Sequence, residues 1–83
     1  MENKIKIEWK TRDFYIASCI LASKISLVRL QKETNKIVSF VFNTTPENAE
    51  QIIQKHWNRE LILPTRNLIE AIHELKTRIF ETL

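Results

Sequence analysis

The chain has 83 residues, enough for a single domain over residues 1–83, because two domains of half that length would be too small to bury a core. Its 43% hydrophobic and 28% charged residues are typical of a globular fold and exclude intrinsic disorder. The chain contains no glycine. Phosphate-binding loops, dinucleotide motifs and nucleophile elbows need glycine where the backbone approaches a ligand or takes a positive φ. We therefore expect a non-catalytic protein without a cofactor.

Net charge is +3 and unevenly distributed, with eight basic against four acidic residues in residues 1–45 and five against six in residues 46–83. A basic first half permits an acidic partner, nucleic acid included, although a charge of this size is also common on soluble surfaces. The single cysteine, Cys19, excludes an intramolecular disulfide and a cysteine zinc cluster. It predicts a cytoplasmic protein in which Cys19 is a small core residue.

The first predicted strand covers residues 4–9, where lysine and apolar residues alternate with period two. Outward lysines suit a strand near the edge of a sheet. A helix is then predicted from Phe14 to about Lys24, capped by Thr11 or Asp13, because either side chain can accept amides of the first turn.

Residues 14–22 of that helix are apolar on nearly every side, which predicts that the helix is covered on more than one side. Nine residues are too few to cross a bilayer, which needs about 17–25. We interpret the run as buried core rather than as a signal peptide, and we expect no membrane association.

Residues 26–32 and 37–42 are β-branched and aromatic runs that predict a central hairpin, with Asn35 taking a positive φ in its turn. The register depends on the length of the loop. With a two-residue loop at residues 34–35, one face of the hairpin would carry Leu27, Arg29 and Gln31 opposite Phe42, Phe40 and Val38. A longer loop would shift this register, so both alternatives remain open.

The second half begins with a strong helix start, in which Thr45 is the cap, Pro46 lies in the first turn and Glu47 lies near the positive end of the helix dipole. One apolar stripe is expected to face the core, made of Ala49, Ile52, Ile53, His56 and Trp57. Asn58 is predicted to end this helix in a left-handed conformation.

Residues 60–63 precede Pro64 and are a candidate for a short further strand. A long helix from Thr65 then carries two adjoining apolar rows, the first made of Leu68, Ile72, Leu75 and Ile79, and the second of Ile69, Phe80 and Leu83. The predicted order is β-α-β-β-α-(β)-α. It describes a small two-layer α+β domain, with a central hairpin and an amino-terminal strand packed on helices.

Segments along nearly the whole chain resemble a small uncharacterised family of bacterial and phage proteins, a domain of unknown function. The similar segments are residues 9–18, 41–42, 45–47, 57–61, 68–71 and 75–80. They contain the patterns T-x-D-F-Y-x-A, T-P-E, W-N-x-E-L and L-K-x-R-I-F. Members of that family are richer in glycine at the hairpin turn and after the first helix, where this chain has Asn35 and Lys24. The resemblance implies no established activity and supplies no functional residue.

Residues that can support catalysis are few. Glu70 and His73 have the spacing used in carboxylate-bridged metal sites, but those sites need two copies and further carboxylates, so we interpret the two residues as a surface pair. His56 has no identifiable nucleophile or orienting carboxylate nearby and is interpreted as a half-buried packing residue. Asp13, the only aspartate, is explained by its position as a helix cap.

Two kinds of binding remain. The apolar first helix and the double row of the last helix offer more apolar surface than this fold needs, which favours a protein partner or self-association. The alternative is a small regulatory nucleic-acid-binding protein, with the aromatic residues Trp9, Phe40 and Phe42 lying among the basic ones. Its candidate contacts are Lys4, Lys6, Lys10, Arg12, Arg29, Lys32 and Lys36.

Overall fold

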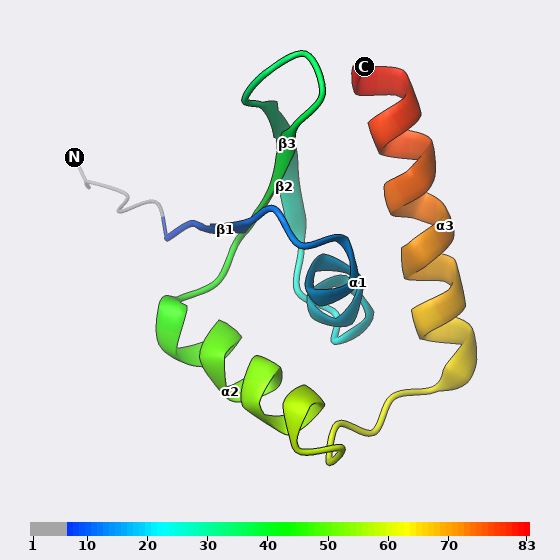
Figure 1. Cartoon of the computed structure of the whole chain (residues 1–83). Coiled ribbons are helices and arrows are strands. Elements are labelled where there is room, and N and C mark those ends of the chain that lie inside the picture. The colour runs from blue at the N-terminus through cyan, green and yellow to red at the C-terminus, as the bar shows by residue number, and fades with distance from the viewer. Residues whose placement is uncertain (1–6) are drawn as a thin grey trace, which may run out of the picture.

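The computed structural model describes residues 7–83. Along the chain, its elements are β1 (Trp9–Thr11), α1 (Phe14–Ala22), β2 (Leu27–Lys32), β3 (Val38–Phe42), α2 (Pro46–Trp57) and α3 (Thr65–Thr82). The strands form one antiparallel sheet in the order β1-β3-β2, with the helices on one side of it (Figure 1). The predicted two-layer α+β domain is confirmed, with the element order β-α-β-β-α-α.

Helix α1 lies at the centre of the domain, between α2 and α3 and against the sheet (Figure 1). Ile16, Ala17 and Ile20 are buried in the core with Phe40 and Phe42 of the central strand. Among the nine residues of α1, Tyr15 is the one that stays exposed. The expectation that this helix is covered on more than one side is therefore confirmed.

The starts of the first two helices follow the sequence signals. At α1, Oδ1 of Asp13 accepts hydrogen bonds from the amides of Tyr15 and Ile16, at 2.9 and 3.0 Å. Of the two predicted caps, Asp13 is therefore the one used. At α2, the hydroxyl of Thr45 accepts the amide of Asn48 at 3.1 Å, with proline following at the first helical position, as predicted.

The hairpin turn contains three residues, because the amide of Glu33 donates to the carbonyl of Ile37 at 2.8 Å. The hydroxyl of Thr34 accepts the amides of Lys36 and Ile37 at 3.2 and 3.1 Å and organises the turn. Positive φ occurs only at Lys24 and Arg59 among residues 7–83, so the positive φ predicted for Asn35 is wrong. A threonine-organised turn does not require it.

The longer loop sets the register of β2 and β3. Leu30 pairs with Phe40 and Lys32 with Val38, which is one residue away from the register of a two-residue loop. An irregularity at Val28 then restores the pairing of Leu27 with Phe42.

Two helices end through left-handed residues other than glycine. Lys24, after α1, has φ 68°, and Arg59, after α2, has φ 63°. Asn58 has φ −85°, so the prediction that it takes the left-handed conformation is wrong. Arg59, one residue later, takes the left-handed conformation instead. The amides of Arg59 and Glu60 donate to the carbonyls of His56 and Lys55, at 3.1 and 2.7 Å, and so close the end of the helix.

Three further expectations differ from the structure. Strand β1 begins at Trp9 instead of covering residues 4–9, of which residues 4–6 lie outside the described part. Residues 60–63 form no strand and connect α2 to α3. Trp57 is 65% exposed rather than packed in the core, because α2 ends there and the side chain lies beyond the packed stripe.

We expect Thr45→Ala to lower the free energy of unfolding by about 1 kcal/mol, because the amide of Asn48 loses its hydrogen-bond acceptor. Denaturant unfolding measures the change, and Thr45→Ser, which keeps the hydroxyl, is the matched control. Equal midpoints for the alanine and serine variants, at constant m-value, would contradict this role.

We expect Lys24→Gly to raise the free energy of unfolding by roughly 0.5–1 kcal/mol, since glycine takes a positive φ without the steric cost of a Cβ atom. Lys24→Ala is the matched control, because it also removes the charge but keeps the Cβ atom. A stabilisation of the same size in both variants would assign the effect to the lysine charge instead.

Candidate functional site

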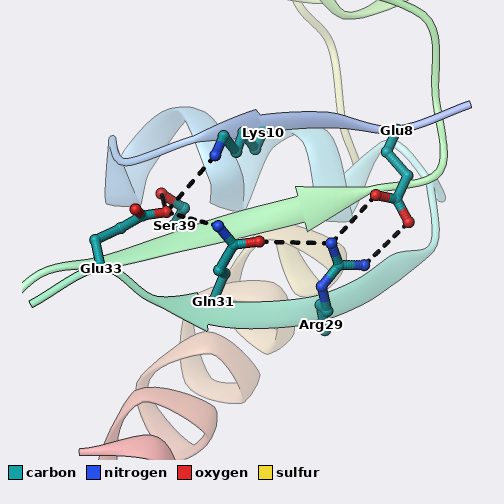
Figure 2. Close-up of polar contacts among 6 residues, drawn as sticks. All are labelled: Glu8, Lys10, Arg29, Gln31, Glu33 and Ser39. Carbon is teal, nitrogen blue, oxygen red and sulfur yellow. Dashed lines mark hydrogen bonds and ion pairs between the residues drawn. The ribbon is translucent and has the colours of Figure 1, made fainter.

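A row of polar side chains crosses the face of the sheet that points away from the helices (Figure 2). Arg29 donates to both carboxylate oxygens of Glu8, at 3.0 and 3.2 Å, and also approaches Gln31 at 3.5 Å. The paired carboxylate raises the pKa of Arg29. Val41 is almost fully buried on this face, because Lys10 and Arg29 flank it from the two neighbouring strands.

Glu33 is the hub at the other end of this row. Its Oε2 accepts hydrogen bonds from Ser39 at 2.9 Å and Gln31 at 3.1 Å, and lies 3.7 Å from Nζ of Lys10. The hydrogen bond from Ser39 is the main reason that the pKa of Glu33 lies below its ordinary value of 4.5. Partial burial opposes this shift, while the charges of Lys10 and Arg12 and the bond from Gln31 add to it.

Of the seven cations proposed as nucleic-acid contacts, the five in the described part of the chain do not share one face. Lys4 and Lys6 lie outside the described residues. Lys10 and Arg29 belong to the polar row, where each is paired with a carboxylate. The remaining three, Arg12, Lys32 and Lys36, lie on the helix side of the hairpin or beside it.

The aromatic rings proposed for stacking on bases are part of the core. Phe40 and Phe42 are almost completely buried. Trp9 is half-buried and its ring lies 6.3 Å from that of Phe42. Phe40 and Phe42 therefore offer no free face for stacking of the kind that single-strand binders use.

A first concave site, which we call the three-helix pocket, lies between α1, the end of α2 and the first half of α3. It has a volume of about 380 Å³. Its lining residues are mostly apolar and comprise Asp13, Tyr15, Ile16, Ser18, Cys19, His56, Trp57, Leu68 and Ile72. Tyr15 and Trp57 are 69% and 65% exposed, so two large aromatic side chains border the pocket and remain open to solvent.

A second site, which we call the hairpin cavity, lies between the start of α1, the hairpin and the end of α3. Its volume is about 400 Å³. It is lined by Arg12, Phe14, Lys36, Ile37, Val38, Phe40, Ile79 and Leu83. Arg12 and Lys36 form no ion pair within residues 7–83, so this apolar cavity has an unneutralised positive edge.

The three-helix pocket contains a cysteine and a histidine in contact. Sγ of Cys19 lies 3.7 Å from Nδ1 of His56. Burial, and secondarily the charge of Asp13, raises the pKa of the Cys19 thiol. Nucleophilic cysteines need the opposite shift, so this geometry describes a neutral thiol packed beside an imidazole. The predicted core position of Cys19 is confirmed, and His56 is half-buried as expected.

Glu70 and His73 are both exposed on α3, as expected for a surface pair, and Glu70 binds Arg66 at 2.8 Å. Within residues 7–83, no group of three or more His, Cys, Asp or Glu side chains is placed to hold a metal ion. No helix in this part of the chain combines the length and apolar character needed to span a membrane.

No protein-family model, no curated protein and no solved structure matches this chain. The resemblance to the uncharacterised bacterial and phage family stays a prediction. Three features of the structure bear on function: the three-helix pocket, the hairpin cavity and the polar row.

The sequence predicted an apolar surplus on both the first and the last helix, and the structure leaves it exposed mainly on the last. The surplus of α1 is covered by the sheet and the neighbouring helices, and Tyr15 is its exposed remainder. On α3, in contrast, the second row is exposed at Ile69, Phe80 and Leu83. The pattern of α2 predicted that Trp57 would be buried, but Trp57 is the last residue of the helix, two residues before the left-handed Arg59, and it is exposed.

We expect Glu33→Gln to destabilise the protein at neutral pH and to lose this effect in acid. Because the folded-state pKa is lowered, the ionised carboxylate stabilises the fold above the ordinary value of 4.5. That contribution disappears as the pH falls through the lower folded-state pKa. Urea unfolding of both proteins in steps from about pH 7 to about pH 3 measures the difference.

Glu60→Gln is the matched control, because Glu60 is exposed and outside the polar row, and its difference from the parent should stay small throughout. A Glu33→Gln difference that is independent of pH would contradict an ionised Glu33 as the hub of the row.

Proposed function

We propose that this chain is a non-catalytic, cytoplasmic protein-binding domain of bacterial or phage origin, which associates with a second copy or another protein through the three-helix pocket. The observation that carries the proposal is an apolar pocket of about 380 Å³ bordered by the exposed rings of Tyr15 and Trp57. Tyrosine and tryptophan are enriched among the residues that dominate binding energy at protein interfaces.

The apolar surface extends beyond the pocket along α3. Leu68 and Ile72 line the pocket, and Ile69, between them, is 60% exposed. Phe80 is 88% exposed further along the same helix. An interface that covered this side of α3 would remove large apolar side chains from water, at roughly 25 cal/mol for each Å² buried.

Binding rather than catalysis is supported by the chemistry of the pocket. The contact between Cys19 and His56 is the arrangement closest to a nucleophile and base, and the raised pKa of the thiol keeps it protonated at neutral pH. The buried, reduced Cys19 also suits the cytosol.

Nucleic acid is the alternative partner. Arg12, Lys32 and Lys36 are the cations that it would use, because they take part in no ion pair within residues 7–83. Burial of Phe40 and Phe42 makes this alternative weaker, since the stacking surface that would accompany those cations is missing from the sheet.

We expect sedimentation equilibrium to show concentration-dependent association whose strength is the same in low and high salt, because burial of apolar surface is scarcely screened. Trp57→Ser should weaken this association by about tenfold or more. Ile62→Ser is the matched control, because Ile62 is 91% exposed, lies on the segment after α2 and lines neither cavity.

An equal effect of both substitutions would assign association to general apolar exposure rather than to the pocket. A monomer that binds an oligonucleotide with a steep salt dependence would favour the nucleic-acid alternative. For a monomer that binds neither, photo-crosslinking from position 15 in cells of the source, with position 62 as the control, tests for a different protein partner.

A further inference from the structure

We propose that the hairpin cavity binds an acidic peptide segment of a partner protein, with one large apolar side chain in the cavity and neighbouring carboxylates held by Arg12 and Lys36. This inference rests on the proposed function, because it assigns a partner chemistry to a protein-binding domain. It concerns a different cavity, so the two proposals can fail separately.

The apolar part of the cavity is open and formed by three separate elements. Phe14 begins α1, Val38 and Phe40 belong to β3, and Ile79 and Leu83 come from the end of α3. Ile37 and Leu83 are 39% and 53% exposed, so apolar surface is available to a ligand at its edge. A volume of about 400 Å³ accommodates a large side chain together with adjoining backbone.

The charge at the edge of the cavity is positive and not neutralised. Arg12 and Lys36 line the cavity without an ion pair in residues 7–83, whereas Lys10 and Arg29 on the other face of the sheet are both paired. Lys32 adds a third cation, because it is directly opposite Val38 in the register and therefore lies on the same face.

Within residues 7–83, the two nearby acidic side chains form no ion pair with Arg12 or Lys36. Glu33 weakens the field of Arg12, but its carboxylate is held on the opposite face of the sheet by Ser39, Gln31 and Lys10. Glu81 lies two residues from both Ile79 and Leu83, and helical spacing therefore directs it away from the side of α3 that lines the cavity. An occupant with apolar and anionic groups side by side complements this arrangement.

A peptide fits these features better than a nucleic acid. The lining of the cavity is mainly apolar and contains two cations, Arg12 and Lys36, rather than a path of cations along the surface. Single-stranded nucleic acids bind along such a path and stack on exposed rings. Anchor residues of peptides, in contrast, insert into apolar pockets while charged neighbours pair with the rim.

The test uses fluorescence anisotropy of a labelled peptide, Glu-Glu-Asp-Leu-Phe-Glu-Glu-Leu, titrated with the full chain. Two further peptides separate the contributions: one with lysine at each acidic position and one with serine at each apolar position. We expect only the parent peptide to bind, with an affinity that falls as salt is raised, because its ion pairs are exposed at the rim.

The protein variant Arg12→Glu/Lys36→Glu should weaken binding by about tenfold or more, because like charges then face each other at the rim. Ile37→Ser/Leu83→Ser should also weaken peptide binding, because it removes apolar contacts between the cavity and the peptide. Lys55→Glu/Lys76→Glu is the matched control, since it changes net charge equally at exposed positions outside the cavity, and it should bind as the parent does. Thermal unfolding of each variant checks that the fold is retained.

Absence of binding by the parent peptide overturns the proposal, as does equal loss in the control variant. If the lysine peptide binds as tightly as the parent peptide, the cavity does not recognise carboxylates. If the serine peptide binds as tightly, the cavity does not recognise an apolar side chain. An oligonucleotide or an anionic lipid vesicle that binds more tightly than the peptide, and loses this binding in Arg12→Glu/Lys36→Glu, assigns the cations to that ligand instead. Trp57→Ser should leave peptide binding unchanged, so failure at the three-helix pocket and failure at the hairpin cavity remain distinguishable.

Discussion

The fold depends on the burial of one short helix. A helix of the length of α1 is not stable alone in water, because the few hydrogen bonds it forms do not offset the entropy of ordering its backbone. It persists because the sheet, α2 and α3 each cover a different side of it. Small side chains at Ala17, Ser18 and Ala22 allow these neighbours to approach closely. The other elements are arranged around α1, which is why its sequence is apolar on nearly every side.

The two concave sites follow from this arrangement. Helices α2 and α3 make their main helix packing contacts with α1 rather than with each other, which leaves the three-helix pocket between them. At the opposite end, α3 extends past α1 and faces the hairpin, which leaves the hairpin cavity (Figure 1). Both sites border the start of α1, and the two residues before the helix give them different charge: Asp13 lines the three-helix pocket and Arg12 lines the hairpin cavity. A domain of this size has too few residues to fill every space around a central helix.

Local signals predicted the fold well and the surface poorly. The caps at Asp13 and Thr45 and the apolar stripe of α3 could be predicted because they depend on neighbours in the sequence. The register of the hairpin could not be predicted. The hydrogen bonds of the Thr34 hydroxyl favour a three-residue turn over a two-residue loop, and the paired strands show that this turn is the one that forms. Exposure of Trp57 and pairing of Lys10 and Arg29 depend on elements that are distant in the sequence. The pattern of one segment does not contain that information.

The irregular pairing at Val28 has a consequence for how copies of the chain can meet. Strands β1 and β2 form the two edges of the sheet, and β1 contains only three residues. On β2, the bulge bends the line of backbone donors and acceptors, and Lys32 places a charge at its end. Neither edge therefore offers a straight template on which another strand could add, and runaway growth of sheets from one molecule to the next is hindered at both edges. This arrangement opposes strand-to-strand aggregation in a chain that carries many solvent-exposed apolar side chains.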